Sequence, residues 1–443
     1  MSKVKMMSAT YKKKGALVPR LRFPEFRDAG EWDCAQMGDI YAFKKNNSFS
    51  RDMLNYNAGD VKNIHYGDIH KKFSSHFYAE NENIPFVNCN INLGSISEDC
   101  LCTAGDIIFA DASEDMKDIG KCIEIISNNK ERILSGLHTI FTRQFSSTLV
   151  IGFGGHLFQS PRVRAQIQKE AQGTKILGIS SGRLAKISIS FPFAKGEQQK
   201  IADCLSSLDE RIAAETNKLD ALKAHKKGLL KQLFPAEGET TPELRFPEFR
   251  GAGEWEEKKL GELANIAMCK RILSKETNEK SGVPFFKIGT IGGMPDAFIS
   301  KELFRKYRYT YNYPKIGEIL ITCSGTVGKI IAYDGQDAYY QDSNIVWIDN
   351  GSGTIVNQFL YYFLEKFNWK KLNTTTITRI YGDDLRNILL IFPTAISEQQ
   401  RIADCLSSLD ELITAQTQKI DLLKDHKKGL MQQLFPRIDE VRA

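Results

Sequence analysis

The chain has 443 residues, a net charge of +6, and a composition that is 42% hydrophobic and 26% charged. This length predicts two to four domains, and the composition is ordinary for a globular protein. The mild basic excess is compatible with a polyanionic partner but does not identify one. No segment approaches the roughly 18 apolar residues of a membrane span, so an integral membrane protein is not expected. Nine cysteines without a C-x-x-C pair favour free thiols and a cytoplasmic location.

The chain begins with a basic segment and continues with a short motif that occurs twice. Residues 1–20 carry six Lys or Arg and no acid, which predicts a flexible tail and no signal peptide. Residues 21–32 read LRFPEFRDAGEW and recur as residues 244–255 with one difference in twelve positions. We call this segment the LRFPEF motif. Its recurrence indicates an internal repeat of domain size.

A longer repeat follows each LRFPEF motif after a variable insert. Residues 197–235 and 398–436 are identical at 29 of 39 positions. Apolar residues recur in both with alternating spacings of four and three, which predicts a coiled coil. At 1.5 Å per residue, each helix should be about 50 Å long. The residues expected to pair the helices are Ile201, Leu205, Leu208, Ile212, Leu219 and Leu222 in the first copy and Ile402, Leu406, Leu409, Ile413, Ile420 and Leu423 in the second.

The inserts between LRFPEF motif and helix differ in length and sequence but share short patterns. Residues 33–196 and 256–397 form inserts of 164 and 142 residues. "IPFV" from Ile84 resembles "VPFF" from Val283, and "GDIIFA" from Gly105 resembles "GEILIT" from Gly317. Short apolar runs between Gly, Asn and Asp turns predict strands. "VNQFLYYFLEKFNWKKL" predicts a helix in the second insert. Each insert is therefore expected to be one mixed α/β domain.

The whole chain is predicted to have a mixed α+β fold with an internal pseudo-twofold repeat. Two similar α/β domains would be joined and separated by two long antiparallel helices. The predicted segments are a basic tail (1–20), a first globular domain (21–192), a first long helix (193–236), a second globular domain (237–393), a second long helix (394–436) and a C-terminal tail (437–443).

Motifs of the common enzyme classes are missing. "CSGTVGKI" resembles the end of a phosphate-binding loop but has Cys323 in place of the first Gly and Ile330 in place of Ser or Thr. No set of Cys and His has zinc spacing, and no H-E-x-x-H is present. We therefore predict no catalytic residue and no bound metal or cofactor. An enzyme whose site is built from non-local residues remains an alternative.

Polar loops rich in Lys, Arg, Asn and Gly occur at comparable places in both inserts. Such side chains donate to base edges and phosphates when rigid elements hold them. The predicted DNA-binding residues are Lys44, Lys45, Asn46, Asn47, Arg51, His65, Tyr66, Asp68, His70, Lys71 and Lys175 in the first insert and Lys270, Arg271, Lys287, Thr290, Ser324, Thr326, Lys329, Asp342, Asn344, Arg379 and Tyr381 in the second.

The repeated frame resembles the conserved regions of specificity subunits of type I restriction-modification systems. The resemblance is carried by "GEW" with "LGEL", and by "IFPTAISEQQRIADCLSSLDELI" with "KKGLMQQLFP". Both patterns occur twice and span residues 21–436; the first copy departs slightly, with "FPFAKGEQQKIADCL". Membership of this family implies that each insert is a target recognition domain for one half of a bipartite DNA site.

The resemblance also implies partners and a division of labour. Two methyltransferase subunits would dock on the paired helices and use S-adenosylmethionine. Restriction subunits, which act as motor and nuclease, would join through the complex and use ATP and Mg²⁺. The chain itself would be a non-catalytic, double-stranded-DNA-binding subunit. The competing hypotheses are a fused methyltransferase or nuclease and a coiled-coil scaffold that does not touch DNA.

Overall fold

The chain folds into two compact units, each of which holds one insert. The computed structural model describes residues 17–94, 96–325, 327–372 and 379–436. The first unit comprises the chain up to residue 216 and from residue 419, and the second comprises residues 217–418. Each unit therefore contains parts of both long helices, which the predicted segment boundaries did not anticipate. The tails 1–16 and 437–443 lie outside the described residues.

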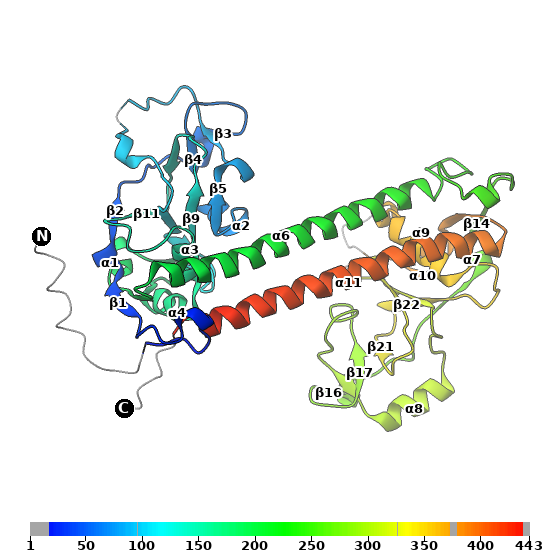
Figure 1. The fold of residues 1–443 in the computed structure, drawn as a ribbon. Helices are drawn as coiled ribbons and strands as arrows, with labels where there is room; N and C mark the ends of the chain where they lie inside the picture. The colour runs from blue at the N-terminus through cyan, green and yellow to red at the C-terminus, as the bar shows by residue number, and fades with distance from the viewer. Residues whose placement is uncertain (1–16, 95, 326, 373–378, 437–443) are drawn as a thin grey trace, which may run out of the picture. The chain divides into compact units, whose positions relative to one another are not determined.

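The first unit is built on a five-stranded sheet with the order β2-β11-β7-β9-β5 (Figure 1). A four-stranded sheet, β10-β4-β6-β3, lies beyond it, and the pairs β1-β13 and β12-β8 complete the unit. The strands are β1 (Asp33–Gln36), β2 (Tyr41–Lys44), β3 (Leu54–Asn55), β4 (Lys62–Ile64), β5 (His76–Tyr78), β6 (Phe86–Val87), β7 (Ile107–Ala110), β8 (Ala112–Ser113), β9 (Cys122–Ser127), β10 (Ile133–Ser135), β11 (Thr139–Gln144), β12 (Leu177–Gly178) and β13 (Ser188–Phe191). The short helices are α1 (Met37–Ile40), α2 (Tyr66–Lys71), α3 (Phe153–Gln159), α4 (Pro161–Glu170) and α5 (Ser181–Leu184).

The second unit has sheets with the orders β15-β22-β19-β20 and β16-β18-β17-β21, and the pair β14-β23. Its strands are β14 (Glu256–Lys259), β15 (Asn265–Ala267), β16 (Thr277–Asn278), β17 (Val283–Phe286), β18 (Phe298–Ile299), β19 (Ile319–Thr322), β20 (Ile330–Ala332), β21 (Tyr339–Tyr340), β22 (Ile345–Asp349) and β23 (Leu389–Phe392). Its helices are α7 (Leu260–Leu263), α8 (Lys301–Thr310), α9 (Asn357–Lys366) and α10 (Gly382–Arg386). The predicted helix of this insert is α9, and a 3-10 turn, Trp369–Leu372, follows it.

The two inserts share one topology. In the smaller sheets β4 pairs with β10 in parallel and with β6 antiparallel, and β17 pairs in the same way with β21 and β18. The matched patterns from Gly105 and Gly317 lead into β7 and β19, which are equivalent strands, as predicted. The match between "IPFV" and "VPFF" is wrong, because the first enters β6 whereas the second is β17, the counterpart of β4. Short apolar runs look alike in sequence, and only strand pairing distinguishes them.

The central sheet of each unit is covered on both faces. Along β7, Ile107 and Phe109 belong to one buried cluster and Ile108 and Ala110 to another, because successive side chains point to opposite faces. The first cluster includes α3, α4 and ends of the long helices; the second includes the smaller sheet. The alternation recurs along β19, where Ile319 and Leu320 belong to separate clusters.

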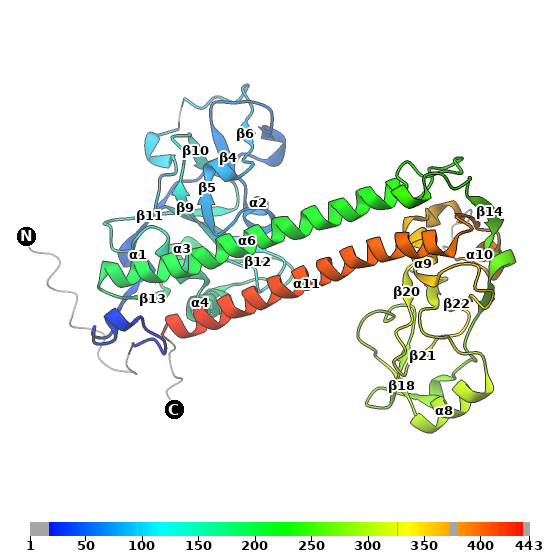
Figure 2. The ribbon, with the colours of Figure 1, turned by 45° about the vertical axis from the view of Figure 1, so that its right-hand side comes forward.

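Helices α6 (Lys195–Gln232) and α11 (Ile396–Leu434) have 38 and 39 residues and are the two long helices of Figures 1 and 2. Within the first unit Lys427 Nζ lies 2.6 Å from Asp209 Oδ2, and within the second Lys226 Nζ lies 2.8 Å from Asp410 Oδ1. In each unit an early residue of one helix thus meets a late residue of the other. The predicted antiparallel pairing is confirmed.

The predicted pairing residues are all buried or half-buried, yet four of them do more than pair helices. Ile201 and Leu205 belong to the core of the first unit, and Ile402 and Leu406 to the core of the second. The first turns of each long helix are therefore embedded in a domain. Among the described residues, no helix combines the length and apolar character that a bilayer span requires.

Candidate nucleic-acid interface

The repeated LRFPEF motif fixes each long helix to its domain. Arg22 donates to both carboxylate oxygens of Glu197 at 2.7 Å, and the Leu21 amide donates to the carbonyl of Gln433 at 3.0 Å. In the second unit Arg245 donates to Glu398 at 2.7 and 2.8 Å, and the Leu244 amide to Gln232 at 2.9 Å. The motif therefore ties the start of one long helix to the end of the other. These contacts occupy residues that the two copies share: Arg22, Glu197, Arg245, Glu398, Leu21 and Leu244.

The loops that differ between the copies surround the ends of the central strands. In the first unit α2 follows β4, and the Nδ1 atom of His65 accepts from the Gly67 amide at 3.1 Å, which caps this helix. Tyr66 packs against His65 and edge-on against His138, with ring centroids 4.7 and 5.2 Å apart. His70 Nε2 lies 2.9 Å from the carbonyl oxygen of Ala112. The structure thus brings three predicted residues together with His138, which was not predicted.

The buried carboxylate of Asp68 binds two cationic side chains close to the rings of His65 and Tyr66. Arg51 donates to the two oxygens of Asp68 at 2.8 and 3.0 Å, and Lys72 lies 3.1 Å from the same carboxylate. Burial alone would raise the pKa of Asp68, but the hydrogen bonds from Arg51 and Lys72 hold it below its ordinary value. Asp68 is 1% exposed and Arg51 is 46% exposed. Asp68 is therefore a support, and the guanidinium of Arg51 keeps an accessible edge.

A shallow, open depression of about 520 Å³ lies beside His138. Its lining includes Asp111, Gln172, Ser180 and Arg183. The predicted residue Lys175 is exposed and lies in the loop that the Gln172–Gly178 bridge closes. Donors and acceptors of this kind on a rigid rim suit polar recognition.

Other predicted residues of the first insert use their side-chain donors in hydrogen bonds within the domain. The Asn46 amide donates to the carbonyls of Gly136 and Thr139, and the Asn47 amide donates to Asn63 and Ser135. Lys44 Nζ donates to both oxygens of Asp99 at 2.7 and 2.8 Å. We therefore assign Lys44, Asn46 and Asn47 to the support of the loops. Lys45 and Lys71 are exposed.

The second unit carries a turn equivalent to the start of α2. The amides of Thr290 and Ile291 both donate to the carbonyl of Lys287 at 3.0 Å, as those of Asp68 and Ile69 do to the carbonyl of His65. Position by position, Lys287 and Thr290 thus replace His65 and Asp68. The same backbone turn presents different side chains in the two units.

The end of β19 gathers further predicted residues. Ser324 Oγ lies 2.8 Å from the side-chain oxygen of Asn344, and the backbone of Ser324 pairs with Arg379. The guanidinium of Arg379 lies over the ring of Tyr381, which is 62% exposed. Thr326 lies outside the described residues. This bridge corresponds to the pairing of β12 with β8 in the first unit.

The remaining predicted cations of the second insert lie near this edge. Arg271 donates to Asp342 at 2.7 Å and is 65% exposed, and Lys329 donates to the carbonyl of Ile291. The carbonyl of Lys270 accepts from Tyr339, while its ammonium lies over the ring of Tyr311. The side-chain contacts thus bring predicted residues of the second insert together in pairs: Arg271 with Asp342, Ser324 with Asn344, and Arg379 with Tyr381.

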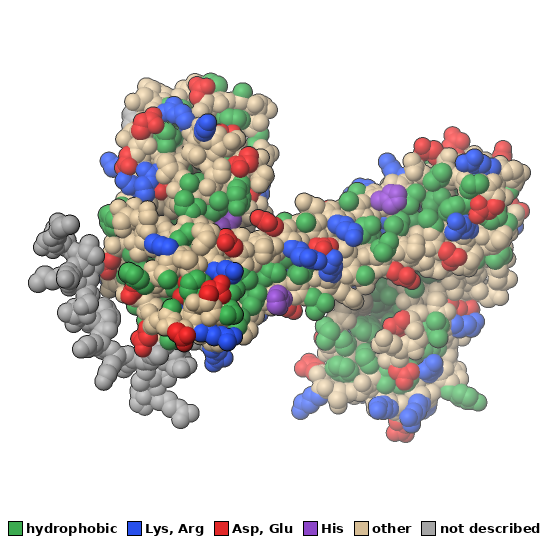
Figure 3. All heavy atoms as spheres, in the orientation of Figure 1, with side chains coloured by type: hydrophobic (Ala, Val, Ile, Leu, Met, Phe, Trp, Pro, Cys, Tyr) green, Lys and Arg blue, Asp and Glu red, His purple; other side chains and the backbone are tan. Residues whose placement is uncertain are grey.

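The surface charge is mixed. On the face shown in Figure 3, basic side chains lie in small groups interspersed with acidic ones. Several of the predicted cations are also paired with a carboxylate: Lys44 with Asp99, Arg51 with Asp68, Arg271 with Asp342 and Lys287 with Asp296. Such an arrangement favours directional hydrogen bonds over bulk attraction to phosphates.

Sequence reasoning missed His138 and Arg183. His138 has a positive φ of 56° and directly precedes β11, as Asn344 directly precedes β22. Aligning the strand "TIFTR" with "IVWID" would have identified His138, because its counterpart Asn344 was already selected. Arg183 lies in the short helix α5, and its sequence context gave no comparable signal.

A known protein family matches this chain twice, and each match includes an insert and most of the long helix that follows it. The family described as "Type I restriction modification DNA specificity domain" matches residues 29–224 and 252–425. A protein of Haemophilus influenzae that carries the name of a type I restriction enzyme specificity subunit is 43% identical over 163 residues. That match covers 37% of this chain and 42% of the relative, so the chain spans less than half of that relative's length.

Solved structures show the same fold. The specificity subunit of a Mycoplasma genitalium type I restriction-modification system, solved by crystallography, has a TM-score of 0.60 and 15% identity, covering 95% of this chain and 99% of that one. A chain from a study of complex assembly and conformational transition in the type I system has a TM-score of 0.53 and 17% identity, covering 91% and 97%. At these identities the likeness concerns the fold alone.

Proposed function

Because the chain belongs to the family of type I restriction modification DNA specificity proteins, we propose that it reads a bipartite DNA sequence, one half with each insert. One observation carries this proposal. The two inserts share a topology and a backbone turn, yet the accessible cation at that turn differs: it is Arg51, held by the buried Asp68, in the first unit and Lys287, in the turn itself, in the second. A fixed scaffold with variable donors and acceptors is suited to reading different base edges in the major groove.

We also propose that the helices act as a spacer and as the docking site for two methyltransferase subunits. The support is the near-identity of the two helical repeats, since one kind of partner that binds twice requires two like surfaces. Restriction subunits would join through the methyltransferases. In this proposal the chain is non-catalytic; S-adenosylmethionine, ATP and Mg²⁺ are used by the partners.

The sharpest test exchanges one insert. Residues 33–196 are replaced by the insert of another family member, and the variant is produced with its methyltransferase subunit in cells. Sequencing of methylated sites should reveal one altered half-site, an unchanged second half and an unchanged spacer. The matched control replaces residues 256–397 and should alter the opposite half. A change in both halves from one exchange would contradict the modular assignment.

The same experiment separates the competing functions. A scaffold without DNA contact would give methylation with no consensus sequence. A fused methyltransferase would modify DNA when this chain is produced without a partner. Methylation that depends on both the partner and the insert supports a specificity subunit.

A further inference from the structure

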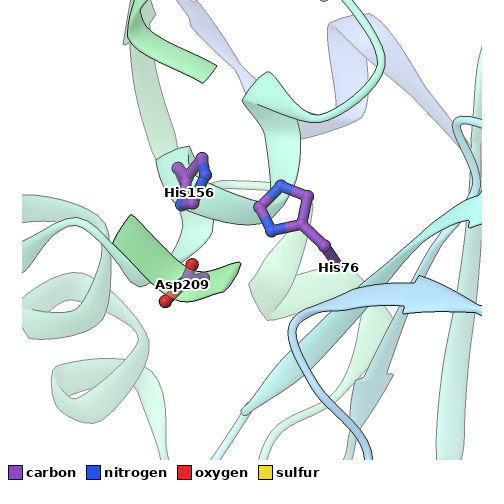
Figure 4. Close-up of side chains that lie close together, drawn as sticks. All are labelled: His76, His156 and Asp209. Atoms are coloured by element: carbon purple, nitrogen blue, oxygen red, sulfur yellow. The ribbon is translucent and has the colours of Figure 1, made fainter. Parts of the chain in front are cut away.

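A cluster of two histidines and an aspartate lies outside the candidate DNA surface. His76 begins β5, His156 lies in α3 and Asp209 lies in α6, and one ligand atom of each lies within 4.8 Å of the others. Figure 4 shows the two rings and the carboxylate converging on a common space. All three residues belong to the first compact unit. Three separate elements thus meet at groups that can bind a cation.

The imidazoles offer unused lone pairs. The Nε2 atom of His76 lies 2.7 Å from the carbonyl oxygen of Gly152, which can only accept, so this nitrogen carries the proton. The Nδ1 atoms of His76 and His156 are buried without a hydrogen-bond partner among the described residues. The two residues are 7% and 0% exposed. Buried polar atoms are normally satisfied by protein, water or an ion.

The protonation state agrees with ligand binding. Burial lowers the pKa of His76 despite its bond to Gly152, and burial with the adjacent His76 ring and Lys427 lowers the pKa of His156 further. Both shifts oppose protonation of the rings. A neutral imidazole is the form that binds a metal.

We propose that His76, His156 and Asp209 form a binding site for a divalent transition-metal ion of the zinc type. Two imidazole nitrogens and one carboxylate are a usual protein ligand set for zinc, with water at a fourth position. Magnesium and calcium favour oxygen ligands throughout. The Gly152 carbonyl, which orients the far nitrogen of His76, provides the outer support that such ligands require.

The ammonium group of Lys427 would repel a cation bound at this site. Its ammonium lies 2.6 Å from Asp209 Oδ2, and it donates to Oδ1 as well. A carboxylate can give one oxygen to a metal and keep the other for the ammonium. The positive charge of the lysine lowers the affinity for a cation, and a bound ion would join β5 and α3 to α6.

The second unit provides a natural control. Tyr362 stands three residues after Phe359, as His156 stands three residues after Phe153, and its hydroxyl lies 2.8 Å from Asp410 Oδ2. Lys226 pairs with Asp410 as Lys427 pairs with Asp209. A phenol that reaches the carboxylate directly replaces the imidazole. No second His/Cys/Asp/Glu group of this kind occurs in the part of the chain that the structure describes.

The test uses the tag-free full chain after removal of metal by a chelator. Titration with Co²⁺ should give one equivalent of binding and the visible absorption of a nitrogen- and oxygen-ligated ion, which Zn²⁺ should displace. His156→Tyr copies the second unit and should weaken binding at least about 100-fold, as should His76→Gln. His225→Asn and His426→Asn alter exposed histidines and should leave the titration unchanged.

The proposal is overturned if the wild-type chain binds no stoichiometric Co²⁺ or Zn²⁺, or if binding survives in the double variant of His76 and His156. Circular dichroism establishes that each variant is folded. Should a variant unfold, X-ray absorption on the zinc-loaded wild type decides, because two imidazole ligands support the site and their absence refutes it. None of these readouts depends on DNA recognition, so the proposed function is tested separately.

Discussion

In the unit with the first insert, Phe435 packs beside Trp32 and Phe153; in the other unit, Phe234 packs beside Trp255 and Phe359. Ring separations are 5.8–5.9 Å in the first and 5.0–6.2 Å in the second. Each domain therefore receives the end of the helix that follows the other domain. The comparison explains why "QLFP" is repeated: it fills equivalent spaces in both cores.

The two units differ in their loops and in one strand, away from the helix ends that they exchange. The turns after β4 and β17 have the same hydrogen bonds and unlike side chains, and, among the described residues, only the first unit has a strand in the position of β5, beside β9. His76 begins this added strand. Contacts that hold the long helices are thus duplicated, whereas loop side chains and added elements are specific to one unit.

The largest effect should come from emptying the exchanged aromatic positions. Phe234 and Phe435 are 1% and 4% exposed, and truncation of a buried phenylalanine typically costs about 3–5 kcal/mol. Phe234→Ala, although it follows the first long helix, should destabilise the unit with the second insert, and Phe435→Ala the unit with the first. Hydrogen exchange resolved by peptide measures each unit separately.

Phe193→Ala is the matched control, because Phe193 is 84% exposed and its loss should be nearly neutral. If Phe234→Ala instead loosened the unit with the first insert, the exchange of helix ends would be refuted.

Much of this frame could be predicted from the sequence. The 4-3 spacing identified both long helices, and the near-identical copies indicated one fold used twice. The embedding of Ile201 and Leu205 in a domain core could not be predicted, because the same apolar spacing serves a helix partner and a sheet. Assignment of "IPFV" failed for a similar reason, since a four-residue apolar run carries no information about its partner strand.

The candidate site was less predictable. Loop composition pointed to Arg51, Tyr66 and Arg271, but it could not separate a donor that is free to bind another molecule from one, such as the amide of Asn46, that is used within the domain. That distinction depends on carbonyls that are distant in sequence, at Gly136 and Thr139. The proposed metal ligands His76, His156 and Asp209 come from three distant segments, so no local spacing could reveal them.

A smaller loss of stability is expected when either of the two lysines that form ion pairs along the long helices, Lys226 or Lys427, is replaced. Lys226 pairs with both Glu365 and Asp410, whereas Lys427 pairs with Asp209. Lys226→Met leaves two carboxylates without their cation and should cost about 2 kcal/mol; Lys427→Met should cost about 1 kcal/mol, since all three carboxylates are partly exposed. Denaturant unfolding of the two variants measures the difference. An equal loss would show that Glu365 contributes nothing to the seam.

The smallest effects on stability should distinguish an arginine that supports its loop, Arg51, from one that is available to contact DNA, Arg271. Arg51 binds a carboxylate that is 1% exposed, and Arg271 binds one that is 17% exposed. Arg51→Met should therefore lower stability by about 1–2 kcal/mol, because Asp68 keeps Lys72 as its remaining cation. Arg271→Met should change stability by less than about 0.5 kcal/mol. In the assembled complex, Arg271→Met should reduce the salt dependence of DNA binding by about one unit of slope if this guanidinium reaches a phosphate. An unchanged slope with altered sequence preference would instead assign Arg271 to a base edge, and no change in either would remove it from the interface.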